Sequence, residues 1–168
     1  MRRLLKAIAP SIFVFFIYIV YSGNITLFDI VTGLVIAIAT GVILGPLVVE
    51  DWKKSLSLPR FFKLVTYIAR YFLIDEVKAH WNVIKIGLNP RMPIKPGIVR
   101  VPIRSKNEYA ITLVAISITN TPGTVVVDVD KERGILYVNW IYVVNEKPDI
   151  TYKEIAEVFD RYASKIFD

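Results

Sequence analysis

The sequence contains no cysteine and no glutamine, and it has a single histidine, His80. Without cysteine the chain has no disulfide framework, no thiolate nucleophile and no Cys-ligated zinc or iron–sulfur site. One histidine also argues against a His-based metal site within the chain. Motifs of the G-x-x-x-x-G-K, G-x-G-x-x-G and G-x-S-x-G types are missing as well. We therefore expect no enzyme, no catalytic residue, no cofactor or metal, and no small-molecule substrate.

Charge is sparse and unevenly distributed along the chain. Charged residues make up 21% of the 168 residues. Hydrophobic residues make up 54%, which is above the roughly 45–50% found in soluble domains. The charge is +3 over residues 1–60 (six basic, three acidic), +6 over 61–104 (eight, two) and −3 over 105–168 (seven, ten). A nucleic-acid-binding protein would gather basic residues on its folded domain, which is here the acidic part. We expect no nucleic-acid partner; the basic middle suits an anionic membrane surface.

Two apolar segments predict a membrane hairpin over residues 1–50. Residues 7–21 carry no charge, and residues 26–49 carry only Asp29. Segments 5–21 and 26–49 are each long enough to cross the hydrocarbon region of a bilayer, and only residues 22–25 connect them. A cleavable signal peptide is the alternative for the first segment. It is disfavoured because no small-x-small cleavage site follows and the second apolar segment begins at once.

Basic residues predict the orientation of this hairpin. The connecting turn has none, whereas basic residues lie before the first span (Arg2, Arg3, Lys6) and after the second (Lys53, Lys54, Arg60, Lys63). Because cytoplasmic flanks are enriched in Lys and Arg, we expect a multi-pass cell-membrane protein with both termini in the cytoplasm.

The second span carries a row of small residues and one acid. Gly33, Ala37, Gly41 and Gly45 are spaced by four and predict a helix-packing face, either for the first span or for another polypeptide. Asp29 lies three residues into the span. A position at the outer, water-accessible interface is the favoured interpretation, and a role in an ion or proton path is the alternative.

Residues 51–88 predict a basic amphipathic helix. From Arg60 onward no Gly or Pro occurs until Gly87. At about 100° per residue the basic residues share one side: Arg60, Lys63, Arg70, Lys78 and Lys85. The opposite arc is apolar: Phe61, Phe62, Val65, Ile68, Ala69, Phe72, Leu73 and Val83. We expect this helix to lie along the cytoplasmic interface, with a third crossing left open if neighbouring subunits shield its charges.

Glu76 and His80 interrupt the apolar arc. They lie four residues apart, so a helix would bring their side chains together. Such a pair could relay protons or bind a cation near neutral pH. The favoured interpretation is an ordinary i,i+4 pair that contacts a partner.

Residues 89–97 predict a proline-rich connector, and residues 98–168 a small cytoplasmic α+β domain of order β-α-β-β-α. We predict strands at 98–103 (at a sheet edge), 123–130 and 135–143, the last two forming a hairpin, and a helix at 151–167 capped by Thr151 and Glu154. Segment 109–119 is ambiguous between strand and buried helix. Asp128 and Asp130 could hold a divalent ion, although solvated edge residues are the commoner case.

A tight turn follows the ambiguous segment. Thr121, Pro122, Gly123 and Thr124 fit a type II turn, in which Pro fixes the second position and Gly supplies the positive φ of the third. The turn would reverse the chain directly into the next strand.

The chain resembles, over essentially its whole length, the E subunits of multisubunit Na⁺/H⁺ (Mrp-type) antiporters. The apolar segment leads into I-T-N-T-P-G-T-V-V-V-D-V and then L-Y-V-N-W-I, and upstream L-N-P-x-x-P-I-x-P-G-I spans residues 88–98. The resemblance implies a membrane subunit with a cytoplasmic α/β domain, and a helix at 109–119. Within this family the same module also occurs in archaeal membrane-bound hydrogenase-type complexes, so the resemblance includes that setting. Asn120 departs from the apolar residue expected before the turn, which affects only the helix end.

The resemblance implies an accessory subunit of a cation/proton antiporter module. Its expected partners are other membrane subunits and the lipid bilayer, since two spans hardly form a gated pathway alone. The competing interpretation is a stand-alone membrane-anchored adaptor on the cytoplasmic lipid surface. It predicts a monomer in mild detergent, whereas the subunit interpretation predicts a large complex.

Overall fold

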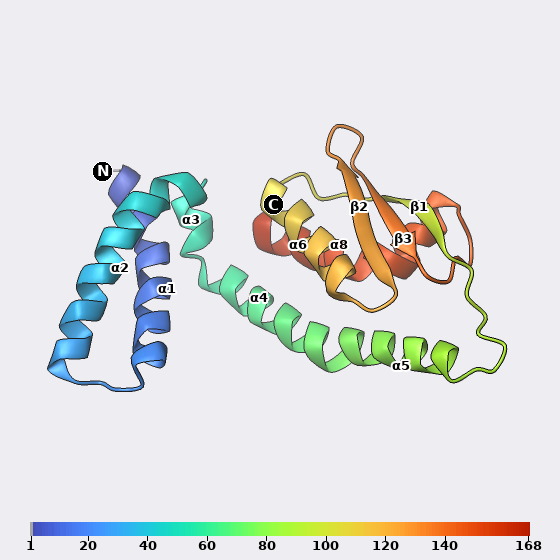
Figure 1. The fold of residues 1–168 in the computed structure, drawn as a ribbon. Coiled ribbons are helices and arrows are strands. Elements are labelled where there is room, and N and C mark those ends of the chain that lie inside the picture. Colours follow the sequence, from blue (N-terminus) through green and yellow to red (C-terminus); the bar gives the residue numbers. More distant parts are fainter. Residues whose placement is uncertain (1) are drawn as a thin grey trace. The chain divides into compact units, whose positions relative to one another are not determined.

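The computed structural model describes residues 2–168 and divides the chain into two compact units, Met1–Leu58 and Pro59–Asp168 (Figure 1). The side chain of Arg2, one of the basic residues used to predict orientation, lies outside the described part. The helical segment that follows residue 58 groups with the sheet domain.

The first unit is an antiparallel pair of long helices with a short third one. Helix α1 (Arg2–Ser22) and helix α2 (Leu27–Val48) are joined by a four-residue link, and α3 (Trp52–Ser55) follows. The apolar stretches Arg3–Ser22 and Leu27–Val48 have mean hydropathies of 2.1 and 2.4, enough in length and composition to cross a membrane. The two predicted apolar helices are therefore present.

The second unit begins with one continuous helical run. Helix α4 (Leu58–Arg70) passes into a π-helical turn, η1 (Tyr71–Asp75), and then into α5 (Glu76–Gly87). The sequence predicted a long helix here but not the π turn, because amphipathic periodicity assumes a uniform 3.6 residues per turn.

A three-stranded antiparallel sheet follows, in the order β1-β3-β2. Strand β1 (Gly97–Pro102) lies at one edge, where the ladder tolerates Pro102, and β2 (Thr124–Asp130) and β3 (Ile135–Trp140) form the predicted hairpin. The third strand ends three residues earlier than predicted. Beyond it the chain bonds to the connector instead: Lys95 N donates to Ile141 O (3.1 Å) and Val143 N to Lys95 O (2.9 Å).

The ambiguous segment is helical, as the resemblance implied. Helix α6 (Glu108–Asn120) buries residues at i, i+1, i+4, i+7 and i+8, a helical spacing that the β-branched composition obscured. These residues are Ala110, Ile111, Val114, Ser117 and Ile118.

The prediction that Thr151 caps the last helix was wrong. The helical run begins three residues earlier, as α7 (Pro148–Thr151), and continues through the π turn η2 (Tyr152–Ala156) into α8 (Glu157–Phe167). Pro148 occupies the first turn, where a missing N–H costs nothing. Thr151 is fully buried, and its hydroxyl donates to the carbonyl of Arg100 on β1 (2.6 Å).

The core of the second unit lies between one face of the sheet and helices α6 and α8 (Figure 1). Val99 and Val101 of β1 and Leu136 and Val138 of β3 are almost completely buried, while their neighbours along the strands are more exposed. Each such side chain contributes roughly 1.5–3 kcal/mol by leaving water. The alternation explains why the strands were predictable from sequence.

Candidate functional site

The π turn η1 pairs side chains that lie five residues apart. In an α-helix such residues point about 140° away from each other. Here the Tyr71 hydroxyl donates to Glu76 Oε1, and Arg70 Nε lies 3.3 Å from Asp75 Oδ2. The π turn therefore organises the polar residues at the middle of the helical run, as single-turn π-bulges often do at functional sites.

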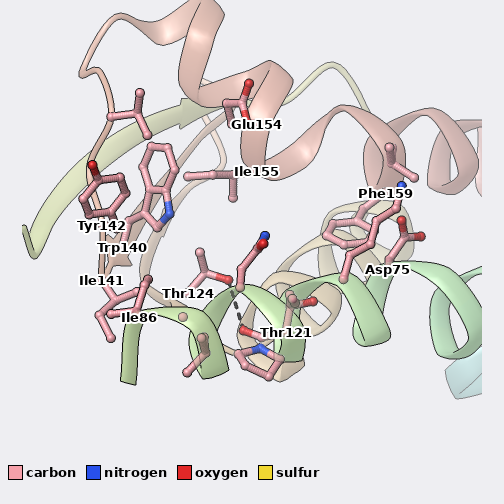
Figure 2. A pocket seen from close by; sticks show the side chains of 18 of the residues that line it. Asp75, Ile86, Thr121, Thr124, Trp140, Ile141, Tyr142, Glu154, Ile155 and Phe159 are labelled. Atoms are coloured by element: carbon pink, nitrogen blue, oxygen red, sulfur yellow. Dashed lines mark hydrogen bonds between the residues drawn. The ribbon is translucent and has the colours of Figure 1, made fainter. Parts of the chain in front are cut away.

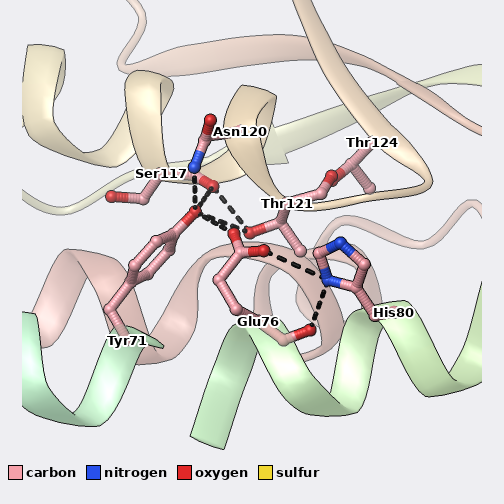
Figure 3. A network of polar contacts seen from close by, with 7 residues as sticks. All are labelled: Tyr71, Glu76, His80, Ser117, Asn120, Thr121 and Thr124. Carbon is pink, nitrogen blue, oxygen red and sulfur yellow. Dashed lines mark hydrogen bonds and ion pairs between the residues drawn. The ribbon is translucent and has the colours of Figure 1, made fainter. Parts of the chain in front are cut away.

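Tyr71 connects this turn to the end of α6 (Figure 3). Asn120 Nδ2 donates to the Tyr71 hydroxyl (3.0 Å), and the same hydroxyl lies 3.4 Å from the Ser117 carbonyl. Thr121 also donates to that carbonyl (2.7 Å). Asn120, the departure from the family signature, thus joins the polar network rather than only ending the helix.

Glu76 and His80, the predicted pair, lie side by side at the edge of this network. His80 Nδ1 lies 3.3 Å from Glu76 Oε2 and 2.9 Å from the Glu76 carbonyl. The Glu76 side chain is 12% exposed and that of His80 is 60% exposed. One carboxylate oxygen thus faces Tyr71 and the other faces an exposed imidazole, an arrangement that can pass a proton between Glu76 and solvent.

Burial and the hydrogen bond to Glu76, in that order, raise the pKa of Tyr71. Tyr71 therefore stays protonated at neutral pH and acts as a donor to the carboxylate. Burial likewise raises the pKa of Tyr67 to about 12, partly opposed by its hydrogen bond with Ser117. Both phenols thus serve as neutral hydrogen-bonding groups between α4–η1 and α6.

The predicted signature turn lines a cleft of about 520 Å³ between α5 and the sheet domain (Figure 2). Thr124 N donates to Thr121 O (3.3 Å), and Gly123 has φ of +96°, the geometry that a type II turn requires. Trp140 and Tyr142 line the cleft from the end of β3, and Glu154 lines it from η2.

Asp29 belongs to the other unit and is used in capping α2. Its backbone N–H donates to Thr26 Oγ1 (3.2 Å), and its carboxylate accepts from the Thr26 backbone N–H (3.2 Å). This reciprocal pair is a capping box at the N-terminus of α2. The carboxylate also suits the positive end of the helix dipole.

The small residues of α2 lie against α1. Gly33, Ala37, Gly41 and Gly45 are the buried residues of α2. A methyl group added at Gly41 would approach Ala7 O to 2.7 Å, and one at Gly45 would approach Lys6 O to 2.7 Å. Of the two partners considered for this face, the first span is the one that it contacts.

The aspartates of the β2–β3 hairpin are used locally. Asp128 Oδ1 accepts from Val129 N (2.8 Å), and Asp130 Oδ1 accepts from Arg133 N (2.9 Å). Within residues 2–168 no three His, Asp or Glu side chains gather to hold a metal ion. Asp130 thus stabilises the turn between the strands, and Asp128 bonds to the neighbouring backbone within β2.

Sequence reasoning missed Asp160, a buried acid of α8. It is 2% exposed, and its carboxylate accepts from Arg104 N (2.9 Å), Ser105 N (3.0 Å) and Ser105 Oγ (2.6 Å). It anchors the chain after β1. Helical projection could have found it, because Asp160 lies between the buried Ala156 and Ala163 on the same helix face.

A sequence model of the family described as Na⁺/H⁺ ion antiporter subunit matches residues 11–166. The chain belongs to the family of Na⁺/H⁺ antiporter E subunits. The E subunit of Alkalihalophilus pseudofirmus is 30% identical over 145 residues, 86% of this chain and 87% of that protein. The E subunit of Bacillus subtilis is 30% identical over 130 residues, covering 76% and 81%. The resemblance drawn from the T-P-G-T turn and its flanks is confirmed.

A solved structure shares the fold of this member of the family. It is a chain of the membrane-bound sulfane sulfur reductase, an archaeal respiratory membrane complex, with a TM-score of 0.84 and 24% identity. The match covers 96% of this chain and 99% of that chain. Both the hairpin and the α/β domain therefore occur together in a solved fold.

Proposed function

We propose that this chain is an accessory subunit of a multisubunit Na⁺/H⁺ antiporter module, which supports assembly and ion translocation without catalysing a reaction. The observation that carries the proposal is family membership along nearly the whole chain, residues 11–166. The wide exposure of apolar side chains on α1 and α2 supports it, because such surfaces require lipid or protein partners.

In this proposal α1 and α2 cross the cell membrane, and both termini and the sheet domain are cytoplasmic. The support is the hydropathy of the two helices and the position of the basic residues around them. The proposed partners are other membrane subunits and the bilayer, with neither a nucleic acid nor a small-molecule substrate.

The Glu76–His80 pair, with Tyr71, is a proposed proton-exchanging site at the edge of the module. It is supported by the mostly buried carboxylate and the exposed imidazole in contact with it. Asp29 is proposed to serve the structure of α2, since its carboxylate is engaged in the capping box. Its part in an ion path is the lesser alternative.

Everted membrane vesicles test the proposed function directly. Vesicles from cells lacking this chain should lose most Na⁺-induced collapse of a respiration-driven pH gradient, and wild-type chain supplied in trans should restore it. The Tyr142→Ala variant, altered in the cleft but outside the α1–α2 hairpin, tests whether the cleft contributes to antiport. Unchanged antiport in vesicles lacking the chain would contradict the subunit role.

A stand-alone adaptor on the lipid surface is the second candidate, favoured by the exposed apolar residues of α4 and α5. It predicts normal antiport in the same vesicles. A respiratory complex is a further setting for the module, and the fold shared with the sulfane sulfur reductase chain is the reason to consider it. Redox-dependent Na⁺ transport in the vesicles would distinguish it from a free-standing antiporter.

A further inference from the structure

The outer face of α4–η1–α5 is a continuous apolar stripe, which we call the outer stripe. Its side chains are 44–63% exposed, although most are large hydrocarbons or aromatics. The outer stripe consists of Phe61, Phe62, Val65, Ile68, Phe72, Val77, Trp81 and Ile84. An apolar surface of this length on a folded domain indicates a contact with lipid or protein.

The π turn aligns the two halves of the outer stripe. Val65 and Val77, like Phe72 and Ile84, are twelve residues apart. In an uninterrupted α-helix each pair would diverge by about 120°, but one extra residue in η1 reduces the difference to about 20°. The straight-helix projection therefore missed Val77, Trp81 and Ile84, and it wrongly assigned Val83 to the apolar arc.

The opposite face of the same helical run is fixed to the sheet domain. At one end Arg60 Nη1 donates to the Ile166 carbonyl (2.6 Å), and in the middle the Tyr67 ring lies 5.5 Å from that of Tyr162. Towards the other end Val83 faces Gly123 across the cleft. A helix fixed in this way could cross a bilayer only if the polar sheet domain entered it too, which argues against a third span.

Charge and connectivity indicate which partner covers the outer stripe. Lys63, Lys78 and Lys85 are exposed along one flank, and the Lys85 ammonium lies 5.5 Å from the centre of the Trp81 ring. Lysines beside an apolar stripe with a tryptophan match an anionic lipid interface. Leu58 follows the end of α2 by only ten residues, so the chain that connects α2 to α4 can extend over at most about 36 Å.

We infer that α4–η1–α5 lies in the interface of an anionic lipid leaflet, with the outer stripe in the acyl region and the lysine flank among the headgroups. The inference rests on the proposed membrane placement of α1 and α2. Glu76 does not break the stripe, because its carboxylate turns inward to Tyr71. His80, at the stripe's edge, would then exchange protons at the lipid surface.

Photocrosslinking from three matched valines tests the inference in native membranes. Val35 on α2, Val77 on the outer stripe and Val127 on β2 are 63%, 59% and 52% exposed. Each is replaced singly by p-benzoylphenylalanine in the full chain, within the assembled complex. Adducts are identified by mass spectrometry after irradiation.

The expected result is lipid adducts at positions 35 and 77 and none at 127. Adducts to another subunit at 77, or no lipid adduct there, would overturn the inference while lipid adducts at 35 leave the membrane placement intact. The absence of both lipid adducts and membrane-subunit adducts at 35 would instead contradict the proposed function. The double variant Lys78→Glu, Lys85→Glu should lower the ratio of anionic to neutral lipid adducts at 77 by about fivefold or more. An unchanged ratio would overturn the headgroup assignment.

Discussion

Tyr67 is the clearest case in which one side chain joins two parts of the second unit. It is 3% exposed, hydrogen-bonded to Ser117 of α6, and packed against the rings of Tyr71 and Tyr162. Ser117 Oγ also donates to the Leu113 carbonyl (2.6 Å), so it keeps a partner without Tyr67. The hydroxyl therefore contributes to stability without being the only link.

Tyr67→Phe should cost about 1 kcal/mol of unfolding free energy at neutral pH. Because folding raises the pKa of Tyr67 from 10.0 to about 12, the unfolded state loses this proton first. The stability that protonated Tyr67 contributes is thus fully present below pH 10 and is lost as pH rises towards 12. Thermal unfolding of the detergent-solubilised chain across this range measures it. An equally steep alkaline loss in the variant would contradict the assignment.

Asp29 is a residue whose type left two interpretations open, a position at the interface and a part in an ion path. An acid in an apolar segment attracts an ion-path interpretation, but its carboxylate and backbone are both engaged with Thr26. We expect Asp29→Asn and Thr26→Ala each to destabilise the start of α2 by about 1 kcal/mol and to leave Na⁺ transport mostly intact. Loss of transport in Asp29→Asn vesicles, at normal complex yield and with an active Thr26→Ala control, would assign Asp29 to the ion path.

At the level of elements, the α1–α2 contact depends on the row of small residues on one face of α2. Gly41→Ala should destabilise the hairpin by about 1–3 kcal/mol, because its methyl group would overlap Ala7 and Ser11. Gly87→Ala is the matched control: it lies at a helix end with open space around it and should be neutral or slightly stabilising. Protease resistance of the membrane-embedded chain compares them. Equal resistance would refute the close packing.

The π turn η1 can be tested by changing the length of the helix. Deleting Leu73, which is 74% exposed, would remove the extra residue and leave both helix faces in register, so the fold should be retained. Inserting one alanine after Leu73 adds a second extra residue and should rotate α5 by about 100° away from the cleft. Tryptophan fluorescence and unfolding temperature report the difference. A variant pair that behaves alike would show that the register is unimportant.

Elements were predictable wherever their periodicity was regular. The two apolar helices and the β2–β3 hairpin follow directly from hydrophobic runs and turn residues. The π turn was hidden, because it changes the angular step between residues without changing their composition. The start of α7 was misplaced since Thr151 carries a capping signature but donates to Arg100 inside the domain instead. Tertiary contacts decided both cases.

The candidate site was predictable only in part. Glu76 and His80 followed from their spacing, and Tyr71 reaches Glu76 only through the π turn. Ser117 and Asn120 contact Tyr71 across 46 and 49 residues of sequence, a separation that no local pattern encodes. Helix α6 was recoverable from the family resemblance, although its own burial spacing is helical. Sequence therefore located the polar pair but not the network that orients it.

At the scale of the whole molecule, the chain combines an apolar hairpin with a domain that carries its own core. Each surface left exposed is of a different kind: hydrocarbon on α1 and α2, a stripe flanked by lysines on α4–η1–α5, and a polar network beside the cleft. In the proposed function, lipid and other membrane subunits cover the two apolar surfaces. An isolated soluble protein would need neither of them.

Extraction of native membranes with mild detergent, followed by native-gel sizing and mass spectrometry, tests the central claim most directly. We predict that this chain migrates in a large complex with multi-span antiporter subunits, and that Gly41→Ala lowers the yield of that complex while Gly87→Ala does not. Redox subunits in the same band would place the module in a respiratory complex. A band at the mass of the chain and its detergent alone would contradict the subunit role.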